Sequence, residues 1–70
     1  MQTFIKIVTP TENGLHNICD VVSISPDTVE KEDGTKKYYV CVYLRQDNIK
    51  YEVESLKEAS QTIENIYIEG

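Results

Sequence analysis

The segment from Tyr38 to Leu44 is apolar on both of its faces, and this property limits what the chain can fold into. Residues alternate in a strand, so the even-numbered residues point to one side. The other side carries three further residues, Tyr39, Cys41 and Tyr43. A single helix covers only one face of a sheet. We therefore expect either a sheet that curls into a barrel, or a second copy or partner packed on the remaining face.

The turn residues predict an antiparallel arrangement. Asn13-Gly14 and Asp33-Gly34 are each typical of a type I′ hairpin turn, and Pro26-Asp27 predicts a turn or a bulge. Segments rich in β-forming residues lie at 4–8, 15–18, 21–25 and 49–53, and residues 28–32 and 35–44 flank Asp33-Gly34. The fold class that we expect is α+β: an antiparallel meander of about five strands, which is able to curl into a barrel, with one C-terminal helix.

The C-terminal helix has a clear start signal. Ser55 followed by Glu58 is a capping box, in which each side chain bonds the backbone amide of the other residue. The apolar positions that follow lie on one helical stripe: Leu56, Ala59, Ile63 and Ile66. Residues 66–70 either extend this helix or form a short additional strand, because Tyr67 and Ile68 favour β-structure.

A strand that runs into a helix is a common place for a phosphate site or a nucleophile, but this junction has neither signature. Residues 49–60 contain no glycine, and Glu52, Glu54 and Glu58 surround the helix N-terminus. Their carboxylates complement the helix dipole and repel an anion. Ser55 has no base nearby in sequence, since the single histidine is on another element. We interpret Ser55 and Glu58 as a structural cap and expect no catalytic residue and no enzyme activity.

The two cysteines do not form a metal motif. Cys19 and Cys41 are separated by 21 residues, and His16 with Cys19 provides only two of the four ligands that structural zinc requires. We interpret both cysteines as reduced packing residues, with a disulfide or a metal or redox role as the alternatives. We expect no metal and no cofactor.

The size and net charge of the chain make some classes of function improbable for it. The chain has 70 residues, with seven basic and twelve acidic ones for a net charge of −5. It predicts one small α+β domain spanning residues 1–70, with no direct nucleic-acid binding because clustered Lys and Arg are absent. Its longest apolar run is too short for a bilayer, and no signal peptide is recognisable, so we expect a cytoplasmic protein. A core of this size supplies only about 3–5 kcal/mol of net stability, which favours a homo-oligomer.

The stretch "IKYEVESLKEA" resembles the C-terminal part of short bacterial proteins of the flagellar FlbD type and of similar small proteins. The residues that carry the resemblance are Tyr51, Val53, Glu54, Ser55 and Glu58, with "ISPDT" at 24–28 in a similar place. The longer hairpin at residues 29–37 departs from that pattern. The resemblance implies a small non-enzymatic accessory fold and no catalytic residue.

These features predict an interface and two functions. We expect Tyr39, Cys41 and Tyr43, together with Phe4 and Val8, to form one stripe opposite the helix that contacts a second copy or a ligand. The leading hypothesis is a binding or assembly module that self-associates through its sheet and acts on a protein partner. The alternative is a phage or mobile-element inhibitor of host defence. It would either sequester a nucleotide signal between tyrosines as an oligomer or block a host defence factor as an acidic protein.

Overall fold

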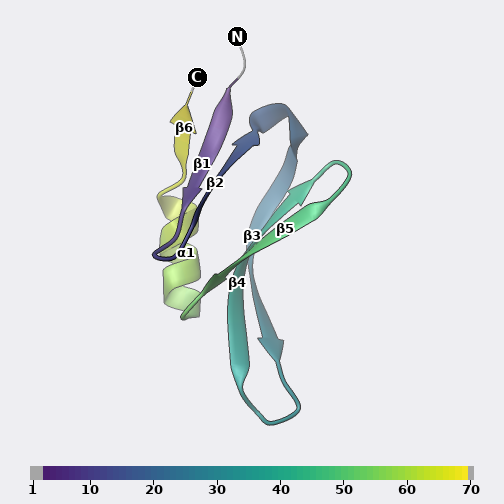
Figure 1. Cartoon of the computed structure of the whole chain (residues 1–70), viewed down its shortest axis with the longest axis vertical. Helices are drawn as coiled ribbons and strands as arrows, with labels where there is room; N and C mark the ends of the chain where they lie inside the picture. The colour runs from purple at the N-terminus through teal and green to yellow at the C-terminus, as the bar shows by residue number, and fades with distance from the viewer. Residues whose placement is uncertain (1–2, 70) are drawn as a thin grey trace.

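The computed structural model describes residues 3–69 and shows an α+β fold with two three-stranded antiparallel sheets (Figure 1). The elements in chain order are β1 (Phe4–Val8), β2 (Asn13–Asn17), a 3-10 turn (Ile18–Asp20), β3 (Val21–Glu30), β4 (Lys36–Leu44), β5 (Asn48–Val53), α1 (Leu56–Glu64) and β6 (Tyr67–Glu69). The α+β class and the C-terminal helix are confirmed. The expectation of one five-stranded meander or a curled barrel is wrong, because the strands separate into two sheets.

The first sheet, which we call the terminal sheet, has the order β2-β1-β6 and joins the two ends of the chain. β1 pairs antiparallel with both neighbours, so that Phe4 lies opposite Glu69 and Lys6 lies opposite Tyr67. Of residues 66–70, for which the sequence allowed either a helix or a strand, Tyr67–Glu69 form a strand, and Gly70 lies outside the described residues. The β-forming pair Tyr67 and Ile68 pairs with β1 in place of a longer helix.

The β1–β2 connection differs from the turn that the sequence predicts. The chain reverses at Thr9–Glu12, where the Thr9 N–H donates to the Glu12 carbonyl over 2.8 Å and the Thr9 hydroxyl accepts from the Glu12 N–H over 3.0 Å. Pro10 supplies the fixed φ of this turn. Asn13 and Gly14 therefore lie within β2, opposite Val8 and Ile7, and the predicted Asn-Gly turn is wrong.

The second sheet, which we call the central sheet, has the order β3-β4-β5. β3 continues through Pro26, which lies opposite Val40, so the predicted turn at Pro26-Asp27 is wrong. Proline is accepted there because β3 is an edge strand, on which a missing N–H removes no ladder bond. The irregularity of β3 lies instead between Val21 and Ser23.

The hairpin between β3 and β4 is at the predicted place but has another turn type. The Gly34 N–H donates to the Lys31 carbonyl over 3.0 Å, and Gly34 alone among the described residues has a positive φ, of 89°. A type I′ turn needs positive φ at both central residues. Because Asp33 does not meet this condition, the hairpin is a type I turn followed by a left-handed glycine. Asp33 instead accepts bonds from the Thr35 amide and hydroxyl.

The helix begins at the predicted cap. The Glu58 N–H donates to Ser55 Oγ over 3.1 Å, which confirms Ser55 as the N-cap. The reciprocal bond, in which the Ser55 N–H would donate to the Glu58 carboxylate, is absent among the bonds of the described residues, so only half of the capping box forms. The helix buries Ala59 and Thr62 and leaves Leu56 exposed. The buried face is thus rotated toward Thr62 relative to the predicted stripe, which places Leu56 at its margin.

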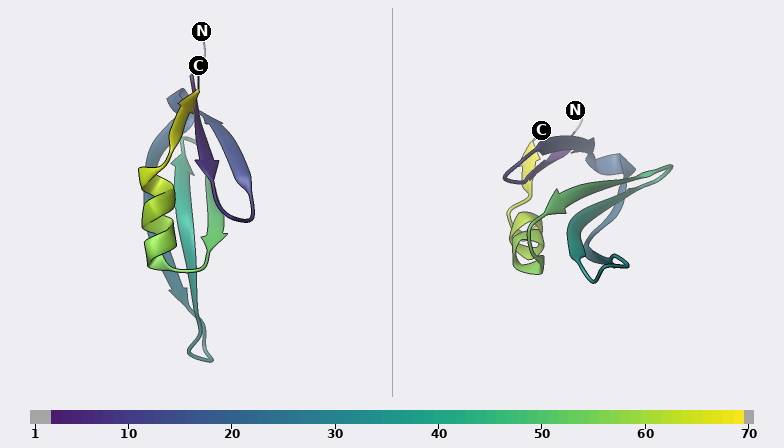
Figure 2. Two further views of the ribbon diagram at one scale, coloured as in Figure 1. Left: turned by 90° about the vertical axis from the view of Figure 1, so that its left-hand side faces the viewer. Right: turned by 60° about the horizontal axis from the view of Figure 1, so that its bottom comes forward.

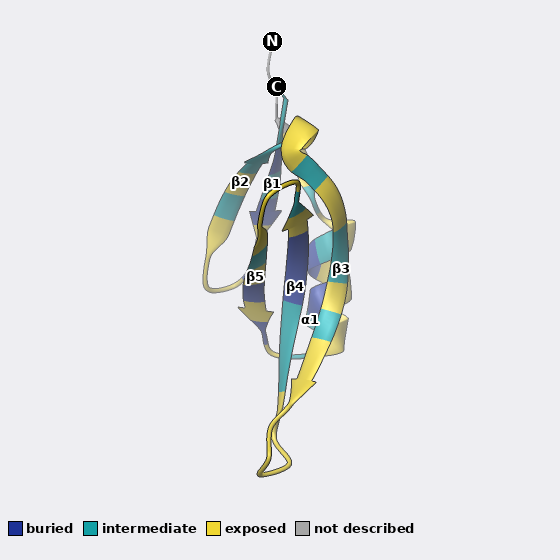
Figure 3. Ribbon diagram, turned by 90° about the vertical axis from the view of Figure 1, so that its right-hand side faces the viewer, coloured by how far each residue is buried: buried dark blue, intermediate teal, exposed yellow. Residues whose placement is uncertain are grey.

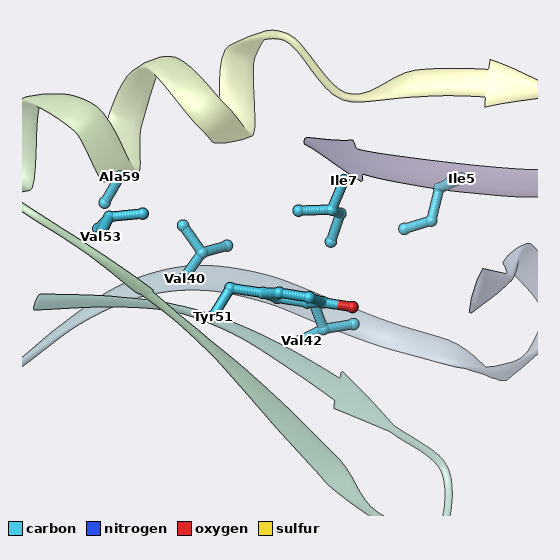
Figure 4. Packing of buried hydrophobic residues seen from close by; sticks show 7 residues of the cluster. All are labelled: Ile5, Ile7, Val40, Val42, Tyr51, Val53 and Ala59. Carbon is cyan, nitrogen blue, oxygen red and sulfur yellow. The ribbon is translucent and has the colours of Figure 1, made fainter. Parts of the chain in front are cut away.

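The core has three walls, formed by the inner faces of the two sheets and by α1 (Figure 2). Figure 4 shows the β1 side chains directed toward those of β4 and β5, with the helix closing the far end. The buried cluster consists of Ile5, Ile7, Val40, Val42, Tyr51, Val53 and Ala59. This arrangement leaves the outer face of each sheet to the side chains that it carries itself.

Candidate interaction surfaces

The five predicted interface residues lie on two outer faces, not on one. Tyr39, Cys41 and Tyr43 alternate with the buried residues of β4 and therefore lie on the outer face of the central sheet, the central face. Phe4 and Val8 flank the inward-directed Ile5 and Ile7 of β1, which places them on the outer face of the terminal sheet. The single continuous stripe that the sequence predicts is wrong, because β1 and β4 belong to different sheets.

The middle of the central face is closed by its own side chains, although Tyr43 toward one end of it is 37% exposed. Lys50 lies opposite Cys41 in the β4–β5 register, and its Nζ reaches Asp27 Oδ2 on the far strand β3, 3.5 Å away. The same ammonium lies 5.4 Å from the centroid of the Tyr39 ring. This side chain crosses β4, and Cys41 consequently has 0% exposure although it points away from the core. Figure 3 shows the corresponding dark blue segment in the middle of β4.

The closed position of Cys41 opposes reaction of its thiol. Burial raises the pKa of Cys41, and the nearby Asp27 carboxylate raises it further. The thiolate is the reactive form of cysteine, so a raised pKa opposes nucleophilic or redox chemistry. Both cysteines are free, with Cys19 exposed at the 3-10 turn. The two cysteines therefore do not form the disulfide that the sequence left open.

The outer face of the terminal sheet, which we call the terminal face, is open. It is defined by five residues: Phe4, Lys6, Val8, Leu15 and Tyr67. Leu15 and Tyr67 lie on either side of Lys6 in the strand register, and their exposures are 57% and 56%. Contiguous exposed apolar side chains of this kind mark interaction sites more often than scattered ones do.

The two sheets meet at a histidine–tyrosine pair. A hydrogen bond of 2.6 Å joins Nε2 of His16 on β2 to Oη of Tyr51 on β5, and the two rings are edge-to-face. Gly14 lies beneath the tyrosine, where a Cβ atom would overlap the phenol oxygen. The glycine that the sequence marks as a turn residue is in fact a packing residue, present because the tyrosine passes directly over the β2 backbone.

The histidine–tyrosine pair is held uncharged. Burial lowers the pKa of His16, and burial followed by the Glu12 carboxylate raises the pKa of Tyr51. Neither shift produces a nucleophile or a charged acid near pH 7. Within residues 3–69, no other side-chain hydrogen bond joins the two sheets. We assign this pair to joining the sheets.

Sequence reasoning missed Leu15 and Tyr67 as surface residues. Leu15 was part of a predicted strand, but its neighbour Lys6 is on β1, and only the strand register brings them together. Tyr67 was in the ambiguous tail and comes beside Lys6 from the other end of the chain. The usable signal was the polar Lys6 in the middle of an otherwise apolar first strand.

The described part of the chain offers few other sites. Across residues 3–69, no three His, Cys, Asp or Glu side chains are grouped in a way that holds a metal ion. The one helix within these residues has nine residues and does not qualify as a membrane span. Comparison with known proteins gives no match: no family model, curated protein or solved structure is significantly similar to the chain.

Proposed function

We propose that the chain is a non-enzymatic binding and assembly module that self-associates through its terminal sheet and acts on a protein partner. The observation that carries this proposal is the contrast between the two outer faces. The middle of the central face, at Cys41, is covered by Lys50, whereas Leu15 and Tyr67 of the terminal face remain more than half exposed, and Tyr67 belongs to β6, an edge strand of the terminal sheet.

The energy available from the terminal sheet is large on the scale of this domain. Burying one large apolar side chain contributes about 1.5–3 kcal/mol. A chain of this size has about 3–5 kcal/mol of net stability from its core. Leu15 and Tyr67 are little more than half exposed, so covering both gains only part of that amount each, and association itself costs free energy. The remaining gain supports an assembly whose population depends on concentration.

The chemistry of the terminal face indicates the kind of protein partner that fits it. Lys6 is the charged residue at its centre, among residues whose side chains the structure describes, and apolar side chains surround it. A complementary surface presents apolar side chains around one carboxylate, which pairs with the Lys6 ammonium. An acidic or nucleic-acid-like partner surface without apolar groups fits this face poorly.

The geometry gives less support to an inhibitor that sequesters a nucleotide between tyrosines. Stacking a base requires an open aromatic ring. On the central face, the Lys50 ammonium already lies over the Tyr39 ring, which leaves Tyr43, at 37% exposure, as the open tyrosine. We therefore do not extend the proposal to a nucleotide ligand.

Two tyrosine variants test the proposal as a matched pair. The wild-type mass should rise above the monomer value of 8.0 kDa with increasing concentration in light scattering. Tyr67→Glu places a charge on the terminal sheet and should keep the mass at the monomer value. Tyr43→Glu places the same charge on the central face and should leave the rise intact. A wild type that remains monomeric at every concentration, or a rise that Tyr43→Glu abolishes and Tyr67→Glu does not, contradicts the proposal.

A further inference from the structure

Four strands form the edges of the two sheets described for residues 3–69, and two of these edges carry a residue that protects them. An unprotected edge offers free N–H and C=O groups to another strand, and proline or charged residues are common protections. β3 carries Pro26 in its middle, and β5 carries Lys50 and Glu52. β2 has neither protection, but apart from Leu15 it carries only polar residues and a glycine.

β6 also lacks these protections along most of its length, and unlike β2 it consists largely of apolar residues. It contains no proline, and its one charged residue, Glu69, stands at its end. Tyr67 lies on the terminal face, and Ile68 lies on the opposite side of the strand, in register with Ile5. Ile68 has an exposure of 71%, the highest among the large apolar residues that the structure describes. β6 is therefore an open edge with exposed apolar side chains on both sides.

We infer that a second copy of this chain pairs with β6 antiparallel, across a two-fold axis at Ile68. This inference rests on the proposed function and specifies its interface. The result is one continuous sheet with the order β2-β1-β6-β6-β1-β2. Ile68 then lies opposite the partner's Ile68, and Tyr67 lies opposite the partner's Glu69. Such a contact is self-complementary and closes after two copies, as a symmetric dimer requires.

Charge favours an edge contact over a face contact. If two terminal faces packed against each other around a two-fold axis, the central Lys6 of each copy would approach the other, and like charges oppose such packing. The edge contact leaves both lysines in water. The paired sheet then presents two terminal faces side by side to a partner protein.

The area involved indicates a weak dimer. Tyr67 and Ile68 together expose roughly 250 Å² per copy, from their fractional exposures and typical side-chain areas. Pairing at the edge covers only part of this area, so both copies bury at most roughly 500 Å² of side-chain surface plus the strand backbones, which is below the ~1,200 Å² of a standard stable interface. We therefore expect a concentration-dependent dimer.

Cysteine cross-linking tests the pairing directly. The variant is Ile68→Cys in a Cys19→Ser background, in which Cys41 is buried. A residue on the two-fold axis meets its own copy at a Cα separation that a disulfide accepts. The matched control is Val22→Cys in the same background, since Val22 is 66% exposed but lies on β3. Under mild oxidation, Ile68→Cys should form the covalent dimer at least about tenfold faster than the control, because pairing raises the effective thiol concentration.

A second pair of variants provides an independent readout. Ile68→Lys adds an edge lysine at an exposed position and should abolish the mass increase without lowering the melting temperature of the monomer, whereas Val22→Lys should leave the mass increase unchanged. Equal cross-linking rates of the two cysteine variants, in a wild type that still dimerises, overturn the β6 pairing and leave the proposed function standing. A wild type that never dimerises overturns both.

Discussion

The terminal and central sheets have the same number of strands, yet their outer faces differ in how far side chains from the neighbouring strands cover them. In the central sheet, a long charged side chain from one edge strand crosses the middle strand and reaches the other edge, as Lys50 does toward Asp27. In the terminal sheet the charged residue, Lys6, is on the middle strand, and its neighbours across the strands are Leu15 and Tyr67. An apolar stripe on a strand is thus covered or open according to what the adjacent strands carry.

The comparison shows why a strand cannot be judged in isolation. Lysine has a long apolar stem that covers neighbouring surface while its ammonium stays in water. The same residue type closes the central face from an edge strand and leaves the terminal face open from the middle strand. The position of one lysine relative to its neighbours thus affects which apolar side chains of an outer face stay exposed.

The largest expected effect on stability comes from the buried side of β1, and a matched change on its exposed side provides the comparison. Ile7→Ala removes a fully buried side chain at the centre of the core and should lower the free energy of unfolding by about 2–5 kcal/mol. Val8→Ala changes the adjacent, exposed residue on the terminal face and should cost less than about 1 kcal/mol. Urea denaturation of both variants measures the difference. Equal losses would mean that the terminal face is buried in the folded protein and that the comparison of the two sheets is wrong.

An intermediate effect is expected where the two sheets meet. Gly14→Ala introduces a Cβ where Tyr51 passes over β2 and should cost about 1–3 kcal/mol, the usual range for overpacking. In a Tyr51→Val background the obstacle is gone, so the same change should cost much less. Thermal or urea denaturation of the four proteins gives the coupling between the two sites. Additive losses would show that Gly14 is required for its backbone conformation and not for the tyrosine.

The smallest effect on stability is expected from removing Lys50, which covers Cys41 on the central face. The same change should alter the chemical accessibility of the Cys41 thiol. Lys50→Ala removes a surface ion pair and should change the free energy of unfolding by no more than about 1 kcal/mol. It also uncovers Cys41, so a thiol reagent should label both cysteines of the folded variant but only Cys19 of the wild type. Lys37→Ala, which removes the neighbouring ion pair with Glu52, is the control. Labelling of Cys41 in the folded wild type would show that Lys50 does not close this face.

Sequence patterns within a few residues were sufficient to predict the helix cap, the place of the central hairpin and the buried side of β5. Ser55 caps the helix because its hydroxyl reaches an amide only three residues away. Asp33-Gly34 marks the central hairpin because a left-handed glycine is needed there, although the turn type differs from the predicted one. The alternation in residues 49–53 correctly separates buried from exposed positions of β5. Each of these features depends on neighbours within a few residues.

The division into two sheets depends on contacts that no local pattern specifies. The sequence predicted Gly14 to be a turn residue because Asn-Gly is a strong hairpin signal. In the structure, a glycine is needed at this position because the ring of Tyr51, far away in sequence, packs directly over it. Similarly, the predicted interface joined Phe4 and Val8 to the β4 residues because apolar alternation does not reveal which sheet a strand enters. The open surface around Lys6 required knowledge that β6 pairs with β1.

The pairing of the first strand with the last also has a consequence for how the protein folds. Residues 21–64, which form the central sheet and the helix, are contiguous in the chain, so pairing among their elements closes short loops. β1 and β2 can likewise form a hairpin early, but the third strand of their sheet follows the helix, and pairing Phe4 with Glu69 closes a loop that runs through every other element. We therefore expect the docking of β6 to be among the last contacts to form. Until β6 docks, β1 is an edge of the terminal sheet, and its unpaired backbone is open to the edge of another partly folded chain.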